Sequence, residues 1–304
     1  MRYYLYSAGL ILLAIIITIL TPFLVDLSED VLISWQIPQN NSQVAGIQKY
    51  NIPPVGKNLP LPNFSARAVL IKDLSTDTVL LQKDANISLA IASTTKIMTA
   101  LVASEYFKQN EVLTVGDSAN TPGSRVGLIR GEDLTFRSVL YGMLLNSGND
   151  AAFTLGENYP GGVLGFVSAM NKKAIGLGLR STHFDNPAGF DSPSHFSSAS
   201  DLAKITEEAL KNPTLARIFA TKETNIVSLN KKYTHQLLNL NKLLSSVQGV
   251  LGVKTGTTEE AKESLVTLVE RSGHRVLLIV LGSNDRFGET TRLIDWTYQN
   301  FQWP

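Results

Sequence analysis

Strand-like runs stand at both ends of the main part of this chain, with a largely helical stretch between them, and this order constrains the fold most. Residues 68–73 and 79–83 are rich in aliphatic and β-branched side chains and are joined by a short polar segment, which predicts a hairpin. Residues 264–270 and 275–281 repeat this pattern around a second short turn near the other end. We expect one antiparallel sheet built from both chain ends, with an inserted helical subdomain.

Helical spacing dominates the middle of the chain, and the last of the predicted helices there ends at Asn212-Pro213. Strands return after Thr221, and an amphipathic helix at residues 290–301 closes the chain. The expected class is α/β (α+β), an antiparallel sheet of about five strands flanked by helices. The predicted middle helices are residues 94–108, 134–145, 150–158, 162–177 and 200–211, and the further predicted strands are residues 226–229 and 250–254.

The N-terminus has the composition of a membrane segment. Residues 3–25 carry no charge and are long enough to cross the hydrocarbon core as a helix. Arg2 precedes the run and acidic residues follow it, which favours a cytoplasmic N-terminus with the rest of the chain exported. A cleaved signal peptide is the alternative, but Phe23-Leu24-Val25-Asp26 at the end of the run offers no small residues for a cleavage site. We expect a single-pass anchor in the cytoplasmic membrane at residues 1–26, an extracytoplasmic linker at 27–62 and a folded catalytic domain at 63–304.

Composition excludes several classes of function. The 304 residues include 27 Lys plus Arg and 26 Asp plus Glu, so the near-neutral chain gives no sign of a nucleic-acid partner. There is no cysteine, which excludes disulfides and thiolate metal sites. The four histidines have no metal-ligand spacing, and we expect them on the surface or in loops. No metal or organic cofactor is implied.

Three short polar motifs occur in order along the predicted domain, and each contributes a hydroxyl, an ammonium or an amide suited to acyl transfer. In the first, Ser93 and Lys96 are three residues apart at the start of a helical run, so they share one helix face. A nucleophile with a candidate base beside it is what a serine acyl-enzyme requires. The motifs are Ser93-Thr94-Thr95-Lys96, Ser147-Gly148-Asn149 and Lys254-Thr255-Gly256.

With these motifs, residues 66–303 resemble the low-molecular-mass penicillin-binding proteins, the serine-type D-alanyl-D-alanine carboxypeptidases. The specific stretches are residues 92–102, 145–151 and 252–258, and residues 186–189 and 198–203 are weaker echoes. The chain departs from the family pattern at Ala261-Lys262, where members usually show Ala-Gly. It also ends after its last predicted helix, without the β-rich stalk and C-terminal anchor of many members, and we expect the N-terminal segment to replace that anchor.

The resemblance implies a role for each polar group of the first two motifs. Ser93 would be the nucleophile and Lys96 the base. A free lysine has a pKa of about 10.4, so burial and a second cation, supplied by Lys254, would have to lower it. Ser147 would relay a proton to the leaving nitrogen, and the Asn149 amide would hold Lys96 and the substrate backbone.

The remaining roles concern substrate binding. Thr255 and Gly256 would lie on a strand where the small glycine lets the substrate approach as an added strand. The backbone N–H groups of Ser93 and Thr257 would form the oxyanion hole. Arg286 matches the position of the arginine that binds the terminal carboxylate in the family, for which a guanidinium is suited.

The resemblance implies a D-Ala-D-Ala carboxypeptidase that trims peptidoglycan stem peptides in the cell wall and is inhibited by β-lactams. A D,D-endopeptidase is an alternative on the same fold, because both enzymes cut after a D-Ala carbonyl. A β-lactamase is another, but the loop at residues 186–200 has no glutamate for deacylation. A non-catalytic penicillin-binding sensor or scaffold is the alternative from another class. It would be expected to lack Ser93, Lys96 or Lys254, and all three are present.

Overall fold

The structure is a computed structural model, and it describes residues 52–304. The predicted anchor at residues 1–26 and most of the predicted linker at residues 27–62 lie outside the described residues. Within residues 52–304, no helix is both long enough and apolar enough to span a bilayer.

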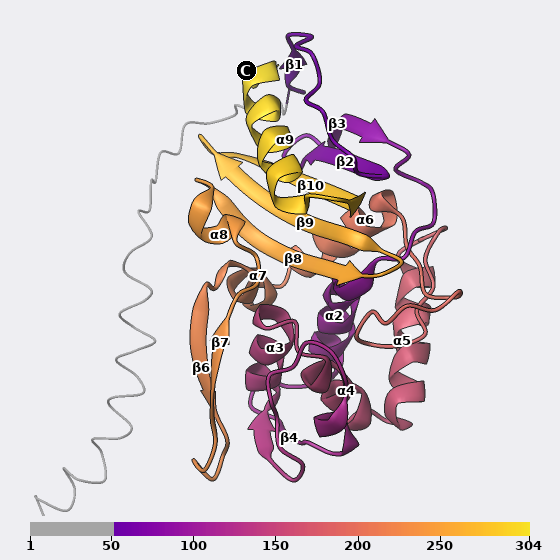
Figure 1. Cartoon of the computed structure of the whole chain (residues 1–304), viewed down its shortest axis with the longest axis vertical. Coiled ribbons are helices and arrows are strands. Elements are labelled where there is room, and N and C mark those ends of the chain that lie inside the picture. The colour runs from indigo at the N-terminus through magenta and orange to yellow at the C-terminus, as the bar shows by residue number, and fades with distance from the viewer. Residues whose placement is uncertain (1–51) are drawn as a thin grey trace, which may run out of the picture. The chain divides into compact units, whose positions relative to one another are not determined.

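A five-stranded antiparallel sheet forms the frame of the described chain, and both chain ends contribute to it, as the sequence predicts (Figure 1). The strand order is β3-β2-β10-β9-β8, which leaves β8 at an edge. The strands are β2 (Ala68–Asp73), β3 (Thr78–Lys83), β8 (Val250–Thr258), β9 (Lys262–Arg271) and β10 (His274–Ser283).

The central strand β10 is buried on both faces, which explains its nearly continuous apolar sequence. Successive side chains of a strand point to opposite faces. Accordingly Leu277 and Ile279 belong to the core on the side of the helical subdomain. Val276 and Leu278 belong to a second core that also contains Leu293 of α9 (Arg286–Asn300). The sheet is therefore covered by helices on both sides.

The helical subdomain contacts the sheet through the short 3-10 segment η1 and through α6 and α7, and Figure 1 shows most of its helices beside the edge strand β8. The five helices predicted for the middle of the chain are present, and their ends differ from the predicted ones by no more than a few residues. The elements are η1 (Ala92–Thr95), α2 (Lys96–Tyr106), η2 (Asp117–Asn120), α3 (Phe136–Leu145), α4 (Asn149–Glu157), α5 (Gly162–Gly176), α6 (Ala199–Leu210), α7 (Pro213–Ala220) and, beside β8, α8 (Leu243–Ser246).

No helix was predicted at residues 213–220, and the structure corrects this with α7. Pro213 is the first helical residue, where its missing N–H has no intrahelical partner to lose. The Asn212 side chain caps the helix by accepting hydrogen bonds from the backbone N–H groups of Thr214 and Leu215. Asn212-Pro213 therefore ends one helix and begins the next.

Three small antiparallel pairs complete the fold of residues 52–304. The predicted strand at residues 226–229 is β6 (Glu223–Val227), and it pairs with β7 (Thr234–Leu238), which was not predicted. β4 (Val112–Thr114) pairs with β5 (Asp133–Thr135). β1 (Val55–Gly56) pairs with β11 (Phe301–Gln302), which joins the end of the predicted linker to the C-terminus.

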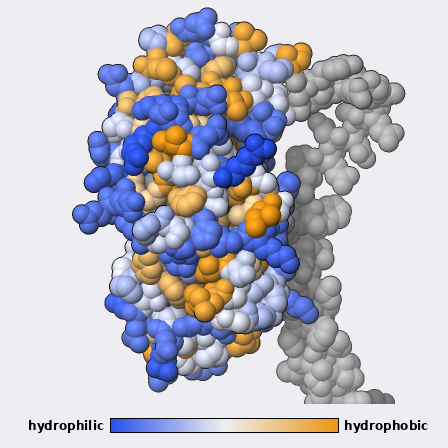
Figure 2. Space-filling model, turned by 90° about the vertical axis from the view of Figure 1, so that its right-hand side faces the viewer, coloured by the Kyte–Doolittle hydropathy of each residue, from blue (hydrophilic) through white to orange (hydrophobic). Residues whose placement is uncertain are grey.

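The surface in Figure 2 shows apolar residues interspersed among polar ones over one face of the molecule. Such a mixture is ordinary for a protein surface, because apolar atoms contribute more than half of it. The chemistry of this protein must therefore be sought in particular groups of side chains.

Candidate active site

The first motif lies where η1 passes into α2, and it brings Ser93 beside Lys96. Ser93 is partly buried in η1, whereas Lys96 is the first residue of α2 and is fully buried. The Lys96 Nζ atom lies 2.9 Å from Ser93 Oγ. The predicted adjacency of hydroxyl and amine is present.

Three oxygens surround the Lys96 amino group. Besides Ser93 Oγ, the partners are Asn149 Oδ1 at 2.8 Å and the Ala188 carbonyl oxygen at 2.7 Å. Both of the latter are pure acceptors. A neutral amine can donate its two N–H groups to them, which leaves its lone pair toward Ser93 Oγ. This geometry suits a general base that takes the proton of the serine hydroxyl.

Burial is the main cause that lowers the pKa of Lys96 well below that of a free lysine. The positive charge of Lys254 lowers this pKa further, and the carboxylate of Asp150 opposes the shift. Lys254 therefore has the electrostatic effect on Lys96 that was predicted for it from the sequence.

The second motif lies at the start of α4. Ser147 has a left-handed backbone with φ 57° and is buried, and Asn149 opens the helix. The Asn149 side chain joins two parts of the site, since its Oδ1 accepts from Lys96 and its Nδ2 donates to the Pro122 carbonyl at 2.8 Å. The amide nitrogen of Asn149 is thus bonded to the loop between η2 and β5. This bond holds the side chain in place while its oxygen orients Lys96.

Asp150 holds the same loop in place. Its carboxylate accepts hydrogen bonds from the backbone N–H groups of Val126, Gly127 and Leu128 at 2.8–3.1 Å. The backbone N–H of Asn149 also donates to the Ser124 carbonyl at 2.7 Å. These bonds bring Ser124 to the pocket, although no motif of the sequence pointed to it.

The third motif lies on β8, whose close approach to η1 requires a glycine. A Cβ atom built on Gly256 would lie 3.0 Å from the Ile91 carbonyl oxygen and 3.2 Å from the Ser93 nitrogen. Only a residue without a side chain leaves room there without displacing the nucleophile segment. The position of Gly256 in the motif thus follows from packing.

Lys254 belongs to the same strand and is fully buried, and its amino group donates to the Thr255 carbonyl at 3.0 Å. Burial, and secondarily the charge of Arg286, lower the pKa of Lys254 to about 7. In the ion pairs of residues 52–304, neither Lys254 nor Lys96 has an acidic partner.

Arg286, the first residue of α9, reaches back over β8. Its Nη1 donates to the Gly256 carbonyl at 2.7 Å and to Thr257 Oγ1. Its backbone N–H donates to the Glu263 carboxylate at 2.9 Å. The guanidinium is thereby fixed at the end of the motif strand, next to the serine.

A pocket of about 120 Å³ lies over these groups, and it collects six of the nine predicted site residues. Lys96, Asn149 and Lys254 lie buried beside it. Larger hollows of about 410 and 420 Å³ elsewhere have no comparable nucleophile and base. The pocket is lined by Ser93, Ser124, Ser147, Leu240, Thr255, Gly256, Thr257 and Arg286.

Several groups of the site were not predicted from the sequence. Ser124 and Leu240 line the pocket but stand outside the three motifs. The Ala188 carbonyl holds Lys96, and its segment was noted only as a weak family echo. His195 was expected at the surface or in a loop; it does lie in a loop, but it is 2% exposed behind η1. Its loop position agrees with the expectation, whereas its burial was not predicted from the sequence.

Comparison with known proteins identifies the family and agrees with the fold. The D-alanyl-D-alanine carboxypeptidase family (peptidase S11) matches residues 56–285. The chain is 34% identical over 257 residues to D-alanyl-D-alanine carboxypeptidase DacF of Bacillus subtilis, a match that covers 81% of this chain and 66% of that protein. It is 34% identical over 258 residues to DacB2 of Mycobacterium tuberculosis, named as the same activity, with 82% and 87% covered.

Solved structures give the same answer. The crystal structure of the Streptomyces K15 DD-transpeptidase superposes with a TM-score of 0.75 at 33% identity, covering 79% of this chain and 100% of that one. The fold and sequence define a serine peptidase, a hydrolase. The chain belongs to the D-alanyl-D-alanine carboxypeptidase family.

The buried Lys254 predicts a pH-dependent effect on stability. Its folded-state pKa of about 7 is below that of an unfolded lysine, so the unfolded chain binds more protons between about pH 7 and 10.5. The penalty for burying Lys254 is therefore greatest below pH 7 and is relieved as the pH rises. Lys254→Met should stabilise the domain at pH 6, on the order of a few kcal/mol, by an amount that shrinks toward pH 10.

Urea unfolding of both proteins at pH 6, 8 and 9.5 measures this difference. Lys108→Met, at an exposed position, is the matched control. A stability difference for Lys254→Met that stays constant with pH would contradict the prediction.

Proposed function

We propose that this protein removes the terminal D-Ala from peptidoglycan stem peptides through an acyl-enzyme on Ser93. The observation that carries the proposal is the arrangement around Lys96. Two carbonyl oxygens accept hydrogen bonds from its amino group, and Ser93 Oγ lies 2.9 Å from the same nitrogen, where the lone pair of a neutral amine would face it. Burial and the charge of Lys254 favour the neutral amine that this role needs.

In the acylation step, Ser93 Oγ attacks the carbonyl carbon of the penultimate D-Ala while its proton passes to Lys96. Backbone N–H groups of Ser93 and Thr257 stabilise the oxyanion. The peptide C–N bond then breaks, and Ser147 passes a proton from Lys96 to the leaving D-Ala nitrogen. A water molecule attacks the resulting ester, which frees the shortened peptide and returns the proton to Ser93.

The position of β8 supports the proposed mode of substrate binding. It is an edge strand of the five-stranded sheet, and Thr255 and Gly256 line the pocket from it. An extended peptide can add to such an edge through main-chain hydrogen bonds. The substrate would then lie between β8 and the Ser147 side of the pocket, with its scissile carbonyl at Ser93.

Slow release of a penicilloyl group is expected from the residues around Ser93. The residues that line the pocket include no Asp or Glu that could activate water toward the ester. Acylation has its base in Lys96, whereas deacylation of a penicillin adduct has no dedicated carboxylate. This favours a penicillin-inhibited peptidase over a β-lactamase.

The first test is adduct formation with benzylpenicillin, followed by intact-mass spectrometry. The full-length protein should gain the mass of one penicilloyl group, and Ser93→Ala should gain none, because the nucleophilic oxygen is missing. Ser124→Ala is a matched control that removes another hydroxyl of the same pocket. An adduct that persists in Ser93→Ala would refute the assignment of the nucleophile.

Arg286 is proposed to bind the terminal carboxylate of the substrate. Arg286→Ala should therefore lose activity on peptides with a free D-Ala-D-Ala end far more than on amidated ends. A hydrogen bond to a charged group contributes about 1.5–3 kcal/mol, which corresponds to a loss of roughly 10- to 100-fold in kcat/KM.

Arg286→Lys keeps the charge but loses the planar guanidinium. Its kcat/KM on free ends should therefore fall between that of the unaltered enzyme and that of Arg286→Ala. An equal loss on free and amidated ends would instead assign Arg286 a structural role through its bonds to β8. High activity of the unaltered enzyme on cross-linked peptides would favour the endopeptidase alternative.

We further propose that residues 3–25 hold the mature protein in the cytoplasmic membrane with its catalytic domain outside. The support is the uncharged apolar run with a basic residue before it and acidic residues after it. N-terminal sequencing of the membrane-extracted protein should find the run still present. A mature N-terminus beyond Asp26 would show cleavage instead.

A further inference from the structure

A buried histidine, His195, lies behind the serine proposed as the nucleophile. His195 comes from the loop before α6, and its ring is held between that loop and η1. The backbone N–H of Asp185 donates to His195 Nδ1 at 3.0 Å. Since Nδ1 accepts, the ring proton of the neutral imidazole must be on Nε2, which lies 2.7 Å from Thr95 Oγ1 and donates to it.

The hydrogen bonds continue from His195 to the residue before the nucleophile. Thr95 Oγ1 accepts a hydrogen bond from the Nε2–H group, and its own hydroxyl donates one to the Ala92 carbonyl at 2.8 Å. Ala92 has φ 48°, a left-handed conformation that an alanine rarely adopts without support from its surroundings. The chain of bonds therefore supports the backbone turn that presents Ser93.

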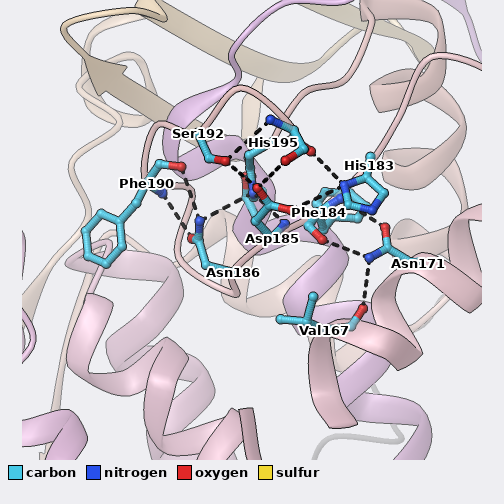
Figure 3. Close-up of polar contacts among 11 residues, drawn as sticks. Val167, Asn171, His183, Phe184, Asp185, Asn186, Phe190, Ser192 and His195 are labelled. Carbon is cyan, nitrogen blue, oxygen red and sulfur yellow. Dashed lines mark hydrogen bonds and ion pairs between the residues drawn. The ribbon is translucent and has the colours of Figure 1, made fainter. Parts of the chain in front are cut away.

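The other side of the ring faces the loop that holds Lys96. Asn186 Nδ2 lies 3.4 Å from His195 Nδ1, and Figure 3 shows Asn186 between His195 and Phe190. The Asn186 side-chain oxygen accepts hydrogen bonds from the backbone N–H groups of Ala188, Gly189 and Phe190 at 2.7–3.1 Å. This turn directs the Ala188 carbonyl at the amino group of Lys96.

The loop and η1 also meet directly. A Cβ atom built on Gly189 would lie 1.9 Å from the Ala92 carbonyl oxygen, the same oxygen that Thr95 binds. Thr99 of α2 adds a bond to the Pro187 carbonyl at 2.7 Å. A displacement of the loop would thus move the backbone next to Ser93 as well as the oxygen that orients Lys96.

We propose that His195 is a positioning residue that sets the distance and orientation between Ser93 and Lys96, acting through Thr95 on one side and the turn at residues 185–190 on the other. This inference rests on the proposed roles of Ser93 and Lys96. His195 touches neither group and takes no proton in the reaction.

The ring can hold these bonds continuously at neutral pH. Burial is the main cause that lowers the pKa of His195, to about 4. Among the charged groups that face it, Asp185 and Asp191 raise this pKa, whereas His183 and Lys96 lower it. A protonated ring would turn Nδ1 into a donor facing the Asp185 N–H, so the neutral form is the one that fits both partners.

The test substitutes His195→Phe in the full-length protein, which keeps a flat ring and removes both hydrogen bonds. Misplacing a base beside its nucleophile slows chemistry more than binding, so acylation by benzylpenicillin should slow by about 10- to 100-fold. With a D-Ala-D-Ala peptide, kcat should fall while KM changes by less than about threefold. First-order acylation rates are followed by intact mass, and they report only folded, reacting molecules.

Three further variants separate positioning from general damage. His274→Phe makes the same chemical change at the start of β10, where the ring stacks on Trp303, and should retain the parent rate. His195→Gln keeps a donor toward Thr95 and should recover much of the rate. Thr95→Val breaks the chain of bonds at its other end, and the double variant with His195→Phe should be no slower than the slower single variant.

A parent-like acylation rate in His195→Phe would overturn the inference, and so would multiplying effects of the Thr95 and His195 substitutions. Either result would leave the proposed function standing, because that depends on the Ser93→Ala adduct test. Absence of any Ser93 adduct in the unaltered protein would instead refute the proposed function itself.

Discussion

Burial of the Lys96 amino group is the constraint on which the rest of the site depends. An amine removed from water must find oxygen partners, and its charged form is disfavoured. The partners come from three separate segments: Ser93 from η1, Asn149 from α4, and the Ala188 carbonyl from the loop before α6. One nitrogen thereby fixes these segments relative to one another, in the geometry that the proposed role of Lys96 as a base requires.

None of the charged groups near the Lys96 amine in the described part of the chain forms an ion pair with it. Lys254 lies buried on the neighbouring strand, and Arg286 beyond it lowers the pKa of Lys254 in turn. Asp150 is the acidic group that acts on Lys96, but its oxygens are occupied by backbone N–H groups of the loop that carries Ser124. A carboxylate paired directly with Lys96 would favour its charged form and remove the base. Asp150 therefore stabilises the loop without pairing with Lys96.

The architecture of the sheet explains why the pocket lies where it does. β8 is an edge strand, so one side of it is open to the helical subdomain (Figure 1). Close packing then requires Gly256 against η1 and Gly189 against the Ala92 carbonyl, where any side chain would displace the nucleophile segment. The helical subdomain supplies Ser147 at the start of α4. The pocket is thus formed at the meeting of two parts of the chain, neither of which holds all its groups.

The sequence by itself determined the sheet with strands from both ends, most helices, and the pairing of Ser93 with Lys96, because these follow from local periodicity and from spacing along one helix. Only the tertiary structure decided which main-chain oxygens hold Lys96, since a carbonyl such as that of Ala188 belongs to every residue type and carries no sequence signature. It also decided that His195 is buried against Thr95, one hundred residues away in sequence. Contacts between distant segments set burial, and burial rather than residue type gives these groups their chemistry.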